Sequence, residues 1–247
     1  KVYRIMNALS RFLRFIKRYF VNPEWRCLAC GAEIFEEGAH FCEKCKEELP
    51  FIEGAYCNHC GRKTKVPEEY CNTCKNVLVN IDKGRSVFRY DKPVNGLIKR
   101  AKYKGEKYIL SAFAEYLASA YFKHYMAADF ICYVPMTAKT EKRRGYNPGK
   151  VLAEMVSEQT KVPVLHCIEK KRETERQVKL TREERRKNLD GAFRITDKKA
   201  VKGKTALIID DVATTGATSE TLAELLKKSG AAAVLLLTVA SVSFDNE

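Results

Sequence analysis

The stretch Thr205-Ala-Leu-Ile-Ile-Asp-Asp-Val-Ala-Thr-Thr-Gly-Ala-Thr218 indicates the fold more clearly than any other part of the chain. Its apolar start, residues 206–209, is typical of a strand buried in a parallel sheet. Two acids follow, and a turn rich in threonine and glycine then leads into an amphipathic helix. This order predicts two carboxylates at the carboxyl end of a strand, next to the free N–H groups of a helix N-terminus. Open α/β sheets bind their ligands at this place.

The residue types of this loop suit a sugar phosphate. Backbone N–H groups and threonine hydroxyls can bind a phosphate, and the acids can bind ribose hydroxyls. The loop resembles the 5-phosphoribosyl diphosphate (PRPP) loop of type I phosphoribosyltransferases, in which two acids precede a Thr-Thr-Gly-x-Thr turn. We expect Asp210 and Asp211 to be the catalytic acids. The expected phosphate ligands are Val212, Ala213, Thr214, Thr215, Gly216, Ala217 and Thr218. The alternative is an ordinary strand–helix turn in which one aspartate caps the helix.

Length and charge limit the classes of protein that fit. The chain has 247 residues, enough for one medium α/β domain and a small module. Its formal net charge of +14 predicts a surface that attracts polyanions. The sequence holds no apolar run of the roughly 18 residues that a membrane span needs, and no signal-peptide pattern. We therefore expect a cytoplasmic protein.

The chain divides into three expected parts. Residues 1–22 predict a basic amphipathic helix, which can pack on its own protein, dock a partner or lie on an anionic membrane surface. Residues 23–80 form a cysteine-rich module. Residues 81–247 alternate strands and helices, which predicts a mostly parallel sheet with flanking helices. The expected strands are 86–90, 130–134, 162–165, 205–209 and 232–239, and the expected helices are 95–103, 108–125, 148–158 and 219–228.

Eight of the ten cysteines fall in four Cys-x-x-Cys pairs. The pairs are Cys27/Cys30, Cys42/Cys45, Cys57/Cys60 and Cys71/Cys74. Zinc binds four thiolates tetrahedrally, so eight cysteines predict two Zn²⁺ sites in a reducing compartment. The near-even gaps permit sequential or cross-braced pairing. Glycine follows the first pair of each putative unit and lysine the second, which favours a tandem repeat with sequential pairing.

A second phosphate-binding region follows the strand expected at 130–134. A basic loop comes next, in which Lys139, Arg143 and Arg144 can pair with a diphosphate, since the guanidinium fork binds oxygens bidentately. The alternative is a solvated basic loop. Further on, the dense charge of residues 176–193 predicts either a lid over a phosphorylated ligand or an exposed surface.

Together these segments resemble the ComF family. The resemblance includes the Cys-x-x-Cys hairpins before Leu49-Pro50, segment 98–105, Val134-Pro135 before Arg-Arg-Gly-Tyr-Asn147, and the Asp-Asp loop. It implies a type I phosphoribosyltransferase fold with an amino-terminal zinc finger. It also implies a role in natural transformation, in which the protein handles single-stranded DNA beside a helicase-like ATPase. Pro148 departs from the family, whose members usually carry glutamine there.

Two functions fit these observations. The first is a DNA-uptake accessory protein that binds single-stranded DNA and keeps a PRPP site. In it Tyr103, Tyr108 and Tyr146, which lie among basic residues, are candidates for stacking on bases. The second is an active phosphoribosyltransferase that uses Mg²⁺-PRPP, with the two aspartates stabilising a cationic ribose. The sequence contains no recognisable pocket for the acceptor.

Overall fold

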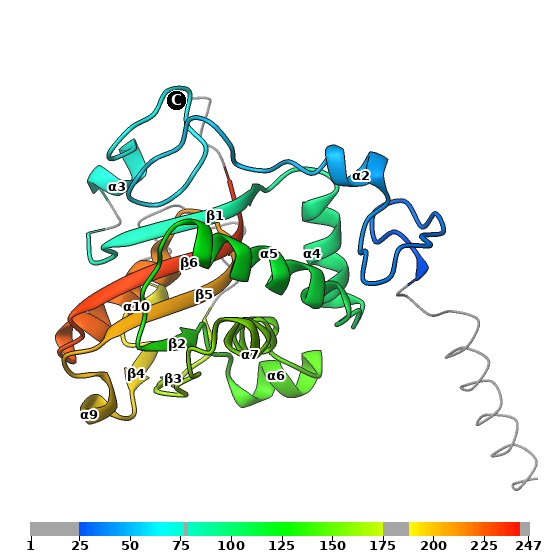
Figure 1. The fold of residues 1–247 in the computed structure, drawn as a ribbon. Coiled ribbons are helices and arrows are strands. Elements are labelled where there is room, and N and C mark those ends of the chain that lie inside the picture. Colours follow the sequence, from blue (N-terminus) through cyan, green and yellow to red (C-terminus); the bar gives the residue numbers. More distant parts are fainter. Residues whose placement is uncertain (1–24, 77–78, 175–187, 243–247) are drawn as a thin grey trace, which may run out of the picture. The chain divides into compact units, whose positions relative to one another are not determined.

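The computed structural model describes residues 25–76, 79–174 and 188–242, and its contacts divide the chain into two compact units between Leu49 and Pro50 (Figure 1). The helix expected over 1–22 and most of the expected lid lie outside the described residues. The first cysteine quartet belongs to the first unit and the second quartet to the second unit, with the sheet. The domain boundary expected at residue 80 stays a prediction. Within the described residues, every helix is too short or too polar to span a membrane.

The larger unit is built on a parallel sheet with the strand order β1-β6-β5-β2. The strands are β1 (Lys83–Arg89), β2 (Phe130–Tyr133), β5 (Thr205–Ala213) and β6 (Ala233–Ser241). All neighbouring pairs are parallel. The apolar run of β5 is fully buried at Leu207, Ile208 and Ile209, because both faces of the sheet are covered.

Helices cover the two faces of this sheet (Figure 1). Helices α5 (Ile109–Lys123) and α7 (Pro148–Thr160) pack against each other and against the strands on one face, and α4 (Val94–Tyr103) packs on α5. Helix α10 (Ala217–Lys228) lies on the other face, where it contacts β4, β5 and β6. The smaller elements are α2 (Glu43–Glu47), α3 (Asn72–Asn76), α6 (Ala138–Arg144), α9 (Lys198–Val201), and the antiparallel pair β3 (Ile168–Lys170) and β4 (Phe193–Ile195).

Strand β5 is longer than expected. The sequence predicted that it ends at Ile209, but it continues through both acids to Ala213. The reason is β6, whose Thr238 and Ala240 lie opposite Asp210 and Val212 in the parallel register. Both acids therefore lie within the last residues of the strand and not in the loop that follows it.

Two other expectations were wrong. Residues 162–165 form only one isolated bridge to β2, between Val164 and Ile131, because Pro163 has no N–H to extend a ladder. Residues 138–144 form the helix α6 and are not a loop. The Thr137 hydroxyl accepts a hydrogen bond from the Thr140 N–H and caps the helix, and Gly145, with φ of +89°, ends it.

Candidate functional site

The twin aspartates line a cleft at the carboxyl end of the sheet. The cleft has a volume of about 770 Å³, and both Asp210 and Asp211 border it. The Asp211 N–H donates to Asp210 Oδ1 at 2.8 Å, which orients the first carboxylate. The Lys102 ammonium, from the end of α4, lies 2.7 Å from Asp211 Oδ1. Lys102 was not among the expected site residues.

The charges of these three groups depend on one another. Burial, followed by the negative charge of Asp211, raises the pKa of Asp210 to about 7. Burial lowers the pKa of Lys102, but the charge of Asp211 and its hydrogen bond outweigh burial, so the net shift is upward. Lys102 and Asp211 form an ion pair at the edge of the cleft. With a pKa of about 7, the Asp210 carboxyl can bind a proton near neutral pH, and a bound cation would stabilise its ionised form.

Basic and hydroxyl side chains from α6 line the same cleft. Arg143 and Arg144 both border it, as do Thr137 and Thr140. The Arg144 guanidinium lies over the ring of Tyr103, 5.3 Å from its centroid. Lys139 lies on α6, but it is not among the residues that line the cleft. The cleft thus joins two of the three basic residues expected for a diphosphate with the two acids.

The expected phosphate turn follows the acids directly but does not line this cleft. Val212 and Ala213 are the last residues of β5, paired with β6. Gly216 has φ of +81° and precedes the first residue of α10, a conformation that favours glycine. The Ala217 N–H is 3.4 Å from the Thr215 hydroxyl. The roles expected for Val212, Ala213, Thr214, Thr215, Gly216, Ala217 and Thr218 stay predictions.

The start of α7 forms a further part of the cleft wall. Asn147 Oδ1 accepts from the Gly149 N–H at 3.0 Å, and its Nδ2 donates to the Val134 carbonyl at 3.1 Å. Asn147 thereby caps α7 and ties it to the end of β2. Pro148 occupies the first turn, where its missing N–H costs nothing. The departure from the usual glutamine at this position is therefore compatible with the helix.

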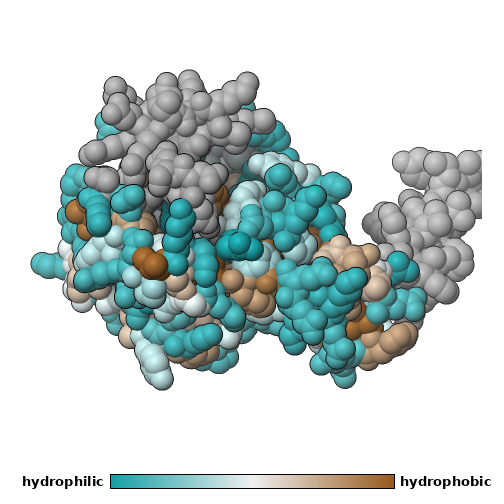
Figure 2. Space-filling model, turned by 90° about the horizontal axis from the view of Figure 1, so that it is seen from above, coloured by the Kyte–Doolittle hydropathy of each residue, from teal (hydrophilic) through white to brown (hydrophobic). Residues whose placement is uncertain are grey.

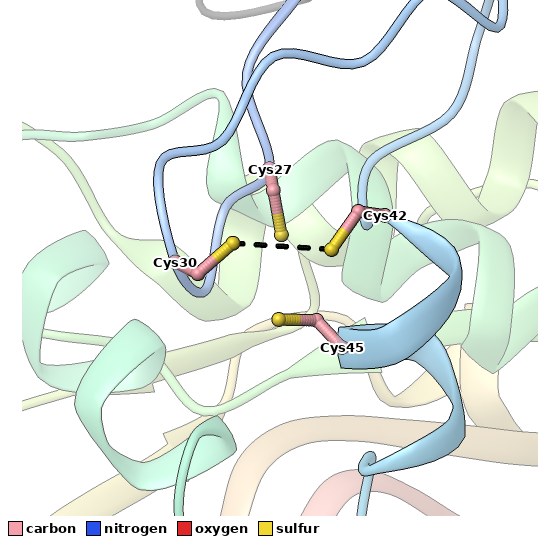
Figure 3. Close-up of side chains that lie close together, drawn as sticks. All are labelled: Cys27, Cys30, Cys42 and Cys45. Carbon is pink, nitrogen blue, oxygen red and sulfur yellow. Dashed lines mark hydrogen bonds between the residues drawn. The ribbon is translucent and has the colours of Figure 1, made fainter.

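The eight paired cysteines form two clusters of four, in sequential order, as the tandem repeat predicted. In each cluster the Sγ atoms all lie within 4.8 Å of one another. Figure 3 shows the first cluster, in which the four side chains point toward a common centre. The Sγ–Sγ separations include 3.8 Å for Cys30–Cys42, 3.6 Å for Cys57–Cys74 and 3.7 Å for Cys60–Cys71. Tetrahedral Zn–S bonds of about 2.3 Å require sulfurs about 3.8 Å apart, so both quartets fit zinc. His40 and His59 belong to neither cluster.

The second quartet is bound to the sheet by backbone and side-chain contacts. The Gly84 N–H, on β1, donates to the His59 carbonyl at 2.5 Å. Arg85 Nη1 donates to the Asn58 carbonyl at 2.6 Å. Arg62, which is 3 % exposed, donates to the Val242 carbonyl beyond the end of β6 at 3.3 Å.

Comparison with known proteins finds matches to both the cysteine clusters and the sheet. The family model described as double zinc ribbon domain matches residues 20–75, and that described as phosphoribosyl transferase domain matches residues 142–245. Competence protein F of Haemophilus influenzae is 29% identical over 83% of this chain and 92% of that protein. Competence protein ComFC of Bacillus subtilis is 28% identical over 85% of each chain. DNA utilization protein YhgH of Salmonella typhimurium is 30% identical over 72% of this chain and 80% of that protein.

Solved structures with similar folds include two phosphoribosyl enzymes. Glutamine PRPP amidotransferase of B. subtilis is 20% identical, with a TM-score of 0.37 over 53% of this chain and 26% of that chain. Adenine phosphoribosyltransferase of Leishmania tarentolae is 15% identical, with a TM-score of 0.37 over 57% of this chain and 74% of that chain.

The parallel sheet with acids at the end of β5, preceded by two four-cysteine clusters, defines a double zinc ribbon protein with a type I phosphoribosyltransferase fold. Within that class the chain belongs to the ComF family of competence and DNA utilization proteins. The family expected from the sequence is confirmed.

Proposed function

We propose that this protein binds Mg²⁺-PRPP in the cleft and serves DNA uptake by binding single-stranded DNA. The observation that carries the proposal is one cleft that joins the Asp210–Asp211 pair to Arg143 and Arg144. Acids suit ribose hydroxyls and a hard cation, and guanidinium groups suit a diphosphate. The names of the relatives, competence protein and DNA utilization protein, support the wider role.

Each group in the cleft then has a part in binding. Asp210 and Asp211 hold the ribose hydroxyls or the metal, and Arg143 and Arg144 hold the diphosphate. The turn at 214–218, which follows the acids but does not line the cleft, receives the 5-phosphate through its N–H and hydroxyl groups. A bound Mg²⁺ neutralises the diphosphate, and carboxylate oxygens are ligands that it prefers. The ion pair with Lys102 orients Asp211 before the ligand arrives.

The proposal for DNA rests on charge and on exposed aromatic rings. The net charge of +14 favours a polyanion. The face seen in Figure 2 is mostly hydrophilic, and its apolar residues form small separate groups. Tyr103 is 72% exposed and Tyr108 39%, so both rings are available for stacking. Tyr146 is only 6% exposed, and its hydroxyl donates to the Ala101 carbonyl, so this tyrosine is a packing residue, the alternative to base stacking that the sequence also allowed.

Calorimetry with PRPP and Mg²⁺ tests the first part. Asp211→Asn should weaken PRPP binding at least about tenfold, equal to about 1.4 kcal/mol. Asp91→Asn is the matched control, because Asp91 is an exposed acid that pairs with Arg89 outside the cleft. A wild-type chain that binds no PRPP would refute the proposed site.

Titration of labelled single-stranded DNA at several salt concentrations tests the second part. If the protein binds DNA through its phosphates, the logarithm of the binding constant should fall linearly with the logarithm of the salt concentration. Tyr103→Ala should cost roughly 1–3 kcal/mol if the ring stacks on a base. Tyr125→Ala is the control, since Tyr125 is 92% exposed and does not line the cleft. Equal losses in both variants would argue against stacking at Tyr103.

Transfer of the phosphoribosyl group to an acceptor is the second candidate function. It is favoured by Asp210, because a carboxyl with a pKa of about 7 can exchange a proton near neutral pH. Pyrophosphate release, measured with PRPP and a panel of nucleobases and amines, distinguishes turnover from binding alone. Release that stays at the rate without protein would reject the transferase.

A further inference from the structure

A glutamate side chain lies among the basic and hydroxyl residues that line the cleft near α6. Glu173, three residues beyond β3, lines the cleft together with Thr137 and Thr140. Its Oε1 accepts a hydrogen bond from the Thr137 hydroxyl. The Thr140 hydroxyl lies 3.0 Å and 3.1 Å from the two carboxylate oxygens. Two hydroxyl donors of the cleft are thus directed at one internal anion.

The surroundings of Glu173 favour negative charge. The hydrogen bond from Thr137, followed by that from Thr140 and the charges of Lys170 and Arg143, hold the pKa of the Glu173 carboxyl below its usual range. Lys170 and Arg143 also line the cleft. Two hydroxyls and two cations around one anion form a set of donors that a phosphate group can use equally well.

We propose that Glu173 is an internal competitor for the diphosphate of the ligand, and that Thr137 and Thr140 are further diphosphate-binding residues. The inference rests on the proposed binding of PRPP in this cleft. The Glu173 carboxylate holds the two hydroxyls while the cleft is empty, and a diphosphate with more charge and more acceptor oxygens displaces it. A monophosphate that uses the same two hydroxyls must displace Glu173 as well, so the carboxylate weakens the binding of both ligands by the same factor.

Displacement of Glu173 requires little rearrangement. Its side chain is exposed, so the carboxylate can turn into solvent once its hydroxyl partners bind the ligand. The chain next to it is held in place, because Lys170 Nζ donates to the Thr174 hydroxyl at 2.8 Å. The apparent dissociation constant is the intrinsic one divided by the fraction of molecules in which Glu173 has left the site.

Calorimetry with inorganic pyrophosphate and Mg²⁺ on the full chain tests this inference. Glu173→Gln and Glu173→Ala should each bind pyrophosphate roughly tenfold more tightly, the factor expected if the carboxylate occupies the site about nine-tenths of the time. Inorganic phosphate that binds at the same two hydroxyls should gain by the same factor. Glu169→Gln is the matched control on the same hairpin, because Glu169 pairs with Arg194 and does not line the cleft. Its affinity should stay within about twofold of wild type.

A double variant tests whether the Thr140 hydroxyl binds the pyrophosphate once Glu173 is removed. Thr140→Val keeps the N–H that bonds to Thr137 but removes the hydroxyl, so adding it to Glu173→Gln should cancel most of the gain. Glu173 variants that bind pyrophosphate no more tightly than wild type, in a chain that binds PRPP, would overturn the internal competitor alone. Absence of PRPP and pyrophosphate binding in every variant would overturn the proposed function as well.

Discussion

The two zinc ribbons have nearly the same cysteine spacing, with 11 residues between the hairpins of the first and 10 in the second, but they differ in what surrounds them. The first lies in a compact unit of its own, residues 1–49, whereas the second belongs to the unit that contains the sheet. Cys57, Cys60 and Cys74 of the second pack in the core cluster of the sheet, with Ile208 and Leu236. In the first, Cys27 and Cys45 are also buried but do not belong to that cluster, and Cys30 is exposed. The second ribbon is therefore part of the core of the sheet unit, and its metal should matter for the stability of the whole unit.

The ribbons also differ in charge. Residues 25–49 carry six acidic and three basic side chains, whereas residues 50–76 carry three acidic and four basic ones. The positive charge of the chain thus lies outside the described part of the first ribbon. For the DNA binding proposed above, this contrast points to the sheet unit and not to the first ribbon.

Removal of one metal ligand should give the largest difference between the ribbons. Cys60→Ser should destabilise the sheet unit by roughly 3–5 kcal/mol, because zinc-binding energy is folding energy for the elements it joins. Cys30→Ser should leave the sheet unit unchanged within about 0.5 kcal/mol. Hydrogen exchange of peptides from β5 and β6 measures this, with zinc content confirming the loss of about one ion from each variant. Equal acceleration of exchange in both variants would contradict the comparison.

The glycines that follow the first cysteine hairpin of each ribbon allow a smaller test. Gly61 has φ of +73°, and a Cβ there would lie 2.4 Å from the Arg85 Cα. Gly31 has φ of +78° but nothing within 4 Å of its Cβ position. Gly61→Ala should cost roughly 2–4 kcal/mol from overpacking and backbone strain, and Gly31→Ala only about 1–2 kcal/mol from strain. Thermal unfolding of the two variants, followed by circular dichroism, should show this order. The opposite order would show that Gly61 does not pack closely against β1.

The next residue in each ribbon gives a weaker effect. Arg62 is buried and bonded to the Val242 carbonyl, whereas the equivalent Ala32 is exposed. Arg62→Met keeps most of the volume but removes the hydrogen bond and the charge, so it should cost about 1–2 kcal/mol. Ala32→Met, as the control, should change stability by less than about 0.5 kcal/mol. Urea unfolding measures both, and a neutral Arg62→Met would mean that the guanidinium is not needed at this junction.

The smallest expected effect concerns the link between the second ribbon and α10. Glu220 accepts hydrogen bonds from the Asn80 N–H at 3.0 Å and from its side-chain amide at 2.6 Å. Burial raises the pKa of the Glu220 carboxyl. A raised folded-state pKa contributes stability that is present at low pH and is lost as the pH rises through that pKa.

Glu220→Gln should remove this pH dependence. Between pH 4 and pH 7 the wild type should lose stability relative to the variant, by less than about 1 kcal/mol. Urea unfolding across that range measures the difference, with Glu224→Gln as the control, since Glu224 forms an exposed pair with Lys228 on the same helix. A relative gain in wild-type stability over this range would contradict the upward shift.

Local patterns were sufficient to predict the main elements. The apolar run before the twin acids predicted β5, and the cysteine pairs predicted two clusters. The spacing left their pairing open, and the glycine and lysine that repeat after the hairpins favoured the observed sequential order. The strength of these signals comes from short-range periodicity and fixed ligand spacing. The helix α6 was missed because its basic residues show no apolar period. Its cap at Thr137 and its stop at Gly145 are the signals that could have identified it.

Contacts between distant segments could not be predicted in this way. The Lys102–Asp211 pair joins residues 109 positions apart, and Glu173 meets Thr137 across 36 positions. Both depend on how α4 and the β3 hairpin pack around the sheet. The different surroundings of the two ribbons depend in part on one position, which is Arg62 in the second ribbon and Ala32 in the first. The role of this difference cannot be predicted until the position of the second ribbon against the sheet is known.

Both outer strands of the sheet are shielded along their free sides. Residues 50–52 and His59 bond to the outer side of β1, and residues 163–165 bond to that of β2. An open strand edge invites pairing with another chain. Loss of zinc from the second cluster would loosen the cover over β1, so metal depletion should make this protein self-associate before it unfolds.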